Sequence, residues 1–186
     1  LHAAGGEIFN VAVDAKGSRA AYGTVDGVLW LHDLQTGKSR ALRRPASPDS
    51  RAAITGVAFH PSRTRLLAAG TGAKTIELWD VVRGQRVATL KGHRAKIARL
   101  AFSPDGRTLA SASRDHSIRL WALDSLGRPS SGAPQVLRGH HAGVYSIAFS
   151  ADGERLASGG YDKTVRLWTL SARPGEPATS VELGRH

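Results

Sequence analysis

Two sets of side chains have the residue types of a Ser-His-Asp hydrolase, in which a histidine takes the proton of a nucleophilic serine and an aspartate orients the imidazole. In chain order the sets are His93, Ser111 and Asp115, then His140, Ser158 and Asp162. A nucleophilic serine needs an exposed hydroxyl beside an oxyanion hole, often on a strained Gly-x-Ser-x-Gly turn. Both serines instead fall inside strand-like segments of matching sequence. Catalysis would require two identical active sites, so we expect no enzyme.

The motifs that could bind phosphate or a metal are also incomplete. The run GTGAKT at residues 70–75 resembles the end of a phosphate-binding loop, but Ala68 and Ala73 replace glycines that such a loop needs. The pair His140-His141 would point to opposite faces of a strand, and no His-Glu-x-x-His is present. The chain has no cysteine. We expect neither a metal nor a cofactor.

The segments that carry the two sets repeat each other. LAFSPDGRTLASASRDHSIRLWAL at residues 100–123 corresponds to IAFSADGERLASGGYDKTVRLWTL at residues 147–170, and Gly-His precedes each at Gly92-His93 and Gly139-His140. Self-similarity at a period of roughly 40 to 45 residues is typical of repeat architectures. The function must therefore be sought on an assembled array.

Two further copies precede these. Residues 57–70 align with residues 100–113, and we expect one extra residue between Gly70 and the following KTIELWD. Residues 11–32 align with 100–121 without a gap, which puts His32, not Trp30, at the tryptophan position. The expected repeats are 1–48, 49–91, 92–138 and 139–186.

Each copy predicts about four short strands and no helix. Apolar and polar residues alternate before each anchor, as in Ile118-Arg119-Leu120, and turn sequences such as Pro104-Asp105-Gly106 separate β-rich runs. The chain is expected to be all-β.

The Gly-His pairs, the SPDG-like turns, the Asp six residues before Trp and the intact Trp79-Asp80 resemble the Trp-Asp (WD) repeat family of β-propellers. The resemblance covers essentially the whole chain and implies four-stranded antiparallel blades around a central channel. Most members have about seven blades, so we expect four blades of a larger propeller. A homodimer closing into eight blades and a small four-bladed ring remain open. The absence of methionine favours an excised segment.

The resemblance also implies a hydrogen-bonded tetrad in each complete blade. The matching residues are His93, Ser111, Asp115 and Trp121 in the third copy and His140, Ser158, Asp162 and Trp168 in the fourth. The second copy has Ser50 at the histidine position and Gly72 or Ala73 near the aspartate position, so its tetrad is absent. The first keeps Asp26 but has Ala4 and His32 at the other two main positions. We expect softer packing in the N-terminal half.

Members of the family commonly dock partners on the face built from the loops entering the first strand and the turns between the second and third strands. The positions carried over that could anchor a partner are Phe9, Lys96, Arg114, Tyr145 and Tyr161. The Pro, Ser and Gly-rich residues 123–135 are expected to form a flexible loop on the opposite face, or a secondary docking element.

The formal net charge is +11, and 20 of the 26 basic residues are Arg. Such a charge favours an acidic partner, phosphate or nucleic acid, but no basic tract is present, and Arg-rich composition alone would also produce it. No apolar run approaches the roughly 18 residues that span a bilayer, and no signal peptide is evident. We expect a cytoplasmic, non-catalytic protein-interaction scaffold without a membrane partner, with phosphate or nucleic-acid binding as the alternative.

Overall fold

The computed structural model describes residues 6–45, 52–170 and 178–185. These residues form four antiparallel sheets of four strands each, and no helix occurs among them. The expected all-β class with four-stranded blades is confirmed. We call the sheets blades 1 to 4 in chain order.

Each blade is a meander in which every strand pairs with the next one along the chain. Blade 1 contains β1 (Ile8–Val13), β2 (Arg19–Thr24), β3 (Leu29–Asp33) and β4 (Ser39–Arg43). Blade 2 contains β5 (Ile54–Phe59), β6 (Leu66–Thr71), β7 (Thr75–Asp80) and β8 (Gln85–Lys91). Blade 3 contains β9 (Ile97–Phe102), β10 (Thr108–Ser113), β11 (Ser117–Ala122) and β12 (Gln135–Arg138). Blade 4 contains β13 (Val144–Phe149), β14 (Arg155–Gly160), β15 (Thr164–Thr169) and β16 (Thr179–Arg185).

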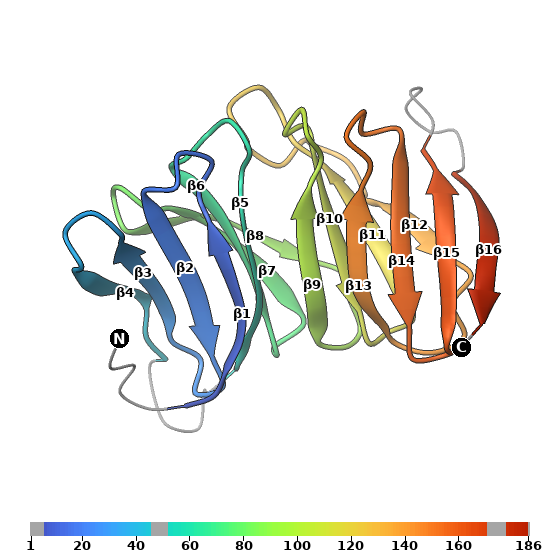
Figure 1. The fold of residues 1–186 in the computed structure, drawn as a ribbon, viewed down its shortest axis with the longest axis horizontal. Coiled ribbons are helices and arrows are strands. Elements are labelled where there is room, and N and C mark those ends of the chain that lie inside the picture. The colour runs from blue at the N-terminus through green and yellow to red at the C-terminus, as the bar shows by residue number, and fades with distance from the viewer. Residues whose placement is uncertain (1–5, 46–51, 171–177, 186) are drawn as a thin grey trace.

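The blades stand in a row, as Figure 1 shows, with blade 1 at one end and blade 4 at the other. The first strands of consecutive blades lie together, since β1 contacts β5, β5 contacts β9, and β9 contacts β13. This is the arrangement that a propeller axis imposes on its innermost strands.

The strand pairing corrects the expected place of one residue. Ala69 pairs with Glu77 as Ser111 pairs with Arg119, so blade 2 runs without an insertion from β6 to β7. The extra residue lies instead in the preceding turn, which His60 N closes on Leu66 O. The error arose because the run Leu66-Leu67-Ala68-Ala69 tolerates a one-residue slip by residue type, although the slip would turn every side chain to the other face.

Neighbouring blades share apolar cores of the same design. A β-branched residue that opens one blade packs against a small residue in the second strand of the blade before it. A Cβ added to Gly23 would lie 2.2 Å from Ile54 Cγ2, and one added to Gly70 would lie 2.6 Å from Ile97 Cγ2. Leu29 and Ile76 add fully buried side chains to these cores. Burial of such side chains supplies most of the stability of a sheet stack.

The two ends of the row each expose half of such a core. Ile8 and Val11 in β1 are 52% and 60% exposed, whereas the equivalent Ile54 and Val57 in β5 are buried. At the other end, an added Cβ on Gly159 would meet nothing within 4 Å. Each end therefore presents an unpartnered apolar face.

Candidate functional site: blade tetrads and the rim of blades 3 and 4

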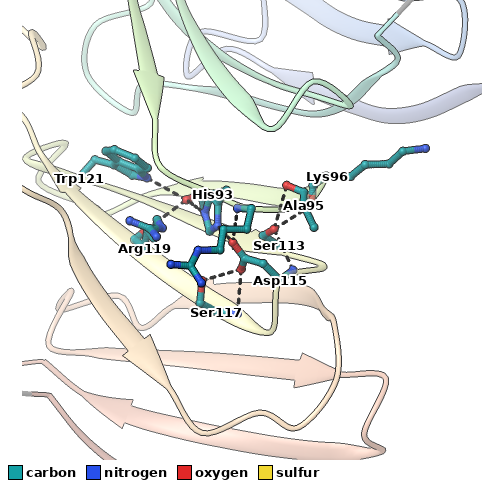
Figure 2. Close-up of polar contacts among 10 residues, drawn as sticks. His93, Ala95, Lys96, Ser113, Asp115, Ser117, Arg119 and Trp121 are labelled. Carbon is teal, nitrogen blue, oxygen red and sulfur yellow. Dashed lines mark hydrogen bonds and ion pairs between the residues drawn. The ribbon is translucent and has the colours of Figure 1, made fainter.

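The tetrad positions of blade 3 form one continuous chain of hydrogen bonds (Figure 2). Trp121 Nε1 donates to Ser111 Oγ at 2.8 Å. Ser111 Oγ lies 2.8 Å from His93 Nε2, and His93 Nδ1 lies 2.8 Å from Asp115 Oδ2. With a neutral imidazole that carries its proton on Nδ1, each group donates to the next in order. The relay satisfies the polar groups of a buried site.

Asp115 is the charged end of this relay. Burial alone would raise the pKa of its carboxyl, but hydrogen bonds from Ser117 Oγ, the Arg94 amide and His93 lower it to about 2. Burial lowers the pKa of His93 below its ordinary value, against the opposing effect of Asp115. The site therefore favours a neutral histidine beside an ionised aspartate at neutral pH.

Blade 4 repeats the relay. Trp168 Nε1 donates to Ser158 Oγ at 2.8 Å, and Ser158 Oγ lies 2.8 Å from His140 Nε2. His140 Nδ1 lies 2.9 Å from Asp162 Oδ2. Burial opposes ionisation of Asp162, but hydrogen bonds from the His141 amide, His140 and Thr164 hold its pKa below the usual range.

Blade 2 satisfies its tryptophan in a way that the sequence analysis missed. Its serine position is Ala69, and Trp79 Nε1 donates instead to Glu77 Oε2 at 3.1 Å. The buried Glu77 carboxylate also pairs with Arg43 Nε of blade 1 at 3.4 Å and with Arg86 Nη1 of β8 at 3.2 Å. A buried carboxylate needs such partners. The expected histidine position, Ser50, lies outside the described residues.

Blade 1 uses aromatic packing at the same place. Tyr22 occupies the serine position and pairs with Trp30 across β2 and β3, which confirms that Trp30 is not the anchor. The two rings are stacked with centroids 6.4 Å apart, and Arg44 Cζ lies 5.4 Å from the Trp30 centroid. His32, at the tryptophan position, has its Nδ1 2.7 Å from Ser39 Oγ. Ala4 lies outside the described residues.

A second residue that the sequence analysis did not single out joins blades 2 and 3. His60 is 3% exposed, and its Nδ1 accepts hydrogen bonds from the amides of Ser62 and Arg63 at 3.3 and 3.1 Å. Its other nitrogen, Nε2, is therefore protonated and donates to Gly106 O of blade 3 at 3.1 Å. A side chain at position 106 would collide with this ring, because an added Cβ would lie 2.2 Å from His60 Cε1. Burial lowers the pKa of His60.

Three of the expected anchors meet at the junction of blades 3 and 4. Arg114 Cζ lies 5.4 Å from the Tyr145 centroid, and the Tyr145 and Tyr161 centroids are 5.0 Å apart. Tyr161 is 75% exposed and Tyr145 is 37% exposed. We call Arg114, Tyr145 and Tyr161 the rim cluster. Cation-π and aromatic contacts of this kind hold side chains at a surface without burying them.

The other two expected anchors are not part of the rim cluster. Lys96 accepts a hydrogen bond at its backbone oxygen from the Arg114 amide at 3.0 Å, and its side chain points away from the tetrad in Figure 2. Phe9 is 52% exposed but lies in β1, at the far end of the row (Figure 1). The structure therefore places Lys96 next to the cluster and Phe9 away from it.

Residues 123–135 contain a hydrogen-bonded turn that contacts blade 2. Asp124 Oδ1 accepts hydrogen bonds from the amides of Leu126 and Arg128, both at 2.8 Å. Gly127 packs against blade 2, where an added Cβ would lie 2.5 Å from Leu66 Cδ2. This segment walls a groove of about 720 Å³ whose other side includes the turns that follow β9 and β13.

The geometry of the serines does not suit hydrolysis. Ser111 is 0% exposed and Ser158 is 3% exposed, so neither hydroxyl can reach a substrate. In the part of the chain that the structure describes, no three His, Cys, Asp or Glu side chains gather as metal ligands. Nor does that part contain a helix long and apolar enough to cross a membrane.

Known proteins share the blade sequence. The chain is similar to the guanine nucleotide-binding protein subunit beta of Arabidopsis thaliana, with 30% identity over 126 residues, which cover 66% of this chain and 33% of that protein. It is 37% identical over 108 residues to subunit beta-5b of the same kind of protein from Danio rerio, covering 58% of this chain and 26% of the relative. It is 32% identical over 121 residues to Pre-mRNA-processing factor 19 homolog 2 of Arabidopsis thaliana, covering 64% and 22%. The matched stretch thus spans a third or less of the length of these curated relatives.

The sequence profile described as "WD domain, G-beta repeat" (WD40) matches residues 46–80, 84–122 and 133–169. These ranges end within the anchor strands of blades 2, 3 and 4. Blade 1 lies before the first match, although it has the same four strands. Because the matches cover more than half of the chain and coincide with three of its blades, the chain belongs to the WD-repeat family.

Proposed function

We propose that this chain is a non-catalytic protein-interaction scaffold and that its partner docks on the rim cluster. The observation that carries the proposal is the convergence of Arg114, from blade 3, with Tyr145 and Tyr161, from blade 4, on an exposed edge. Arginine and tyrosine are over-represented among the residues that dominate binding energy. Two of the relatives are, by their names, subunits of a guanine nucleotide-binding protein.

The tetrads support this role because they hold the turns that carry Arg114 and Tyr161. Asp115 follows Arg114 directly and receives the hydrogen bonds of His93 and the Arg94 amide. Asp162 follows Tyr161 and receives those of His140 and the His141 amide. Each turn that carries a rim residue is therefore tied to the loop entering its own blade. A docking surface fixed in advance loses less entropy on binding.

The exposed end faces favour a larger ring. We propose that further blades of a parent chain cover β1 and blade 4, because residues equivalent to Ile8 and Val11 are buried wherever a neighbouring blade is present. A second copy of this segment is the alternative. Light scattering coupled to size exclusion distinguishes them: a compact dimer of the 186-residue segment would support the second copy. A monomer that aggregates through its end faces would support the parent chain.

Site-specific photocrosslinking tests the docking proposal. A photoreactive phenylalanine analogue at position 161 should capture a discrete protein in cells that make the chain, and Arg114→Ala should abolish the capture. The matched control is the same analogue at Val82, which is 49% exposed in the turn between β7 and β8. Equal capture from both positions, or none from position 161, would contradict docking at the rim cluster. The expected cytoplasmic location stays a prediction, which fractionation of the same cells would test.

A further inference from the structure

We infer that the rim cluster selects acidic protein segments in which a carboxylate stands beside an aromatic or large apolar side chain. The inference rests on the proposed docking function and specifies the chemistry of its partner. It is argued from the guanidinium of Arg114, from the exposed rings of the two tyrosines and from the charged residues around them.

Arg114 offers an anion site that is already oriented. Its guanidinium carbon lies 5.4 Å from the centroid of the Tyr145 ring, and the residue is exposed to solvent. No acidic side chain of the described residues forms an ion pair with Arg114. A planar guanidinium held in this way matches a carboxylate through two parallel hydrogen bonds.

The tyrosines provide the apolar half of the site. Their rings are inclined by 39° with centroids 5.0 Å apart. Tyr145 thus contacts both Arg114 and Tyr161, while Tyr161 is 75% exposed. An aromatic or large aliphatic side chain of a partner can cover Tyr161 and exclude water from the adjacent ion pair. The two contacts require a carboxylate and an apolar group next to each other on the partner.

Close packing keeps the cluster in this arrangement. Gly143 lies at its base, and an added Cβ there would stand 3.2 Å from both Arg114 Cα and Tyr145 Cε2. The Tyr161 amide donates to Gly143 O at 2.8 Å. A methyl group at position 143 would push on both residues and require shifts of a few tenths of an ångström, without removing either binding group.

The surrounding charge favours an acidic partner over a basic one. The exposed cations on the same two blades include Arg94, Lys96, Arg99 and Lys163. The nearby carboxylates, Asp115 and Asp162, are ionised and offset part of this charge, but these four cations and Arg114 outnumber them. The remaining excess of positive charge attracts acidic segments and repels basic ones.

The same geometry favours a protein over a nucleic acid. Bases bind by stacking on open aromatic or guanidinium faces along a basic track. Among the described residues of blades 3 and 4, the exposed Phe, Tyr or Trp rings are those of Tyr145 and Tyr161, and Tyr145 already contacts both Arg114 and Tyr161. The rim cluster therefore offers a base about one stacking position, whereas a single strand is bound through several such positions along its length.

The probes for the test are a random copolymer of glutamate and tyrosine, polyglutamate, and a single-stranded oligothymidine, each fluorescently labelled and titrated at physiological salt. We expect the copolymer to bind more tightly than the other two. Arg114→Ala and Tyr161→Ala should each weaken it about tenfold. Arg114→Lys, which keeps the charge but loses the planar contact, should fall between wild type and Arg114→Ala, and Gly143→Ala should weaken binding with all functional groups retained.

Arg107→Ala is the matched control, because Arg107 is exposed and lies at the opposite end of β10 from Arg114. It should change binding less than twofold. Equal loss in Arg107→Ala and Arg114→Ala would overturn the inference in favour of diffuse attraction. Oligothymidine binding as tight as copolymer binding, with a steep salt dependence, would overturn it in favour of nucleic acid. If a protein is captured from position 161 but the copolymer does not bind, the preference for acidic segments is wrong and docking at the rim cluster still holds. If neither capture nor copolymer binding is observed, both the preference and the docking function are wrong.

Discussion

Blades 2 and 3 contain the same anchor tryptophan and satisfy it in opposite ways. In blade 3 the indole of Trp121 donates to a neutral hydroxyl on the neighbouring strand, and the relay ends at Asp115 within the same blade. In blade 2 the indole of Trp79 donates to the charged Glu77 of its own strand, and that charge draws in Arg43 from blade 1. The first arrangement fixes a blade internally, whereas the second also ties it to its neighbour.

The difference shows that the tryptophan, more than the tetrad, is the constant requirement of these two blades. A buried indole N–H needs an acceptor, and either a hydroxyl or a carboxylate can supply it. The carboxylate needs cationic partners because an unpaired buried charge is costly. Loss of the tetrad therefore does not by itself leave a blade without polar anchoring, and the expected softness of the N-terminal half stays a prediction.

The largest effect should come from Glu77→Ala. The substitution leaves the Trp79 indole without its acceptor and Arg43 without its carboxylate, so we expect a loss of about 3 kcal/mol in the free energy of unfolding, measured by denaturant titration. Arg86→Ala is the control, because the Arg86 side chain is 53% exposed and its ion pair should contribute less than about 1 kcal/mol. Equal losses in the two variants would show that Glu77 is not the centre of the network.

Ser111→Ala should have the next largest effect. It removes the acceptor of Trp121 and the partner of His93, both buried, at a cost of about 2 kcal/mol. Adding Arg119→Glu places a carboxylate at the position equivalent to Glu77, and the double variant should recover part of the loss because the indole regains an acceptor. Thermal unfolding of the three proteins gives the comparison. A double variant less stable than Ser111→Ala would show that the two solutions are not interchangeable.

His60→Ser should cost about 1 kcal/mol at neutral pH, through loss of the hydrogen bond to Gly106 O. It should also alter the response to acid. Since the pKa of His60 in the folded chain lies below its ordinary value of 6.5, the stability it contributes is present above pH 6.5 and is lost as the pH falls through that folded-state pKa. Unfolding titrations between pH 7 and pH 5 should therefore show a shallower decline in the variant. An unchanged slope would assign the acid sensitivity to other groups, with His93 first among them.

Tyr161→Ala should have the smallest effect on stability. Because this side chain is 75% exposed, the free energy of unfolding should change by less than about 0.5 kcal/mol, although binding of an acidic partner should fall. Circular dichroism melts beside the binding titrations would separate the two. A marked loss of stability would mean that the rim cluster also supports the blades.

The fold followed from the sequence to the level of single strands because repetition fixes both register and turn positions. Alignment of residues 11–32 with 100–121 located blade 1, which the family profile does not cover. The one misplaced residue lies in the turn after β5. It precedes a run of similar apolar residues, in which a shift of one position changes the alignment little. Pairing across the sheet, which sequence does not show directly, decides such cases.

The site was less accessible from sequence. Positions such as His93 and Ser111 could be named because they recur, and the rim residues could be named by register. Glu77 could not, because its partners come from separate strands and one of them from another blade. His60 stands where blades 3 and 4 have a serine. Its role becomes clear only from the structure, in which Gly106 of the next blade packs against its ring. Charge pairing and contacts between blades depend on three-dimensional neighbours that no repeat specifies.

The exposed apolar faces at the two ends of the row differ in shape, and this difference gives any assembly of the segment a direction. Gly159 belongs to a surface made to receive an opening strand, and Ile8 belongs to an opening strand that has nothing to enter. A surface of either kind lacks the complement of its own shape, so neither can join to a copy of itself. Assembly from this segment would therefore proceed head to tail, with a polarity that closes into a ring when the rotation allows and otherwise grows into a fibre.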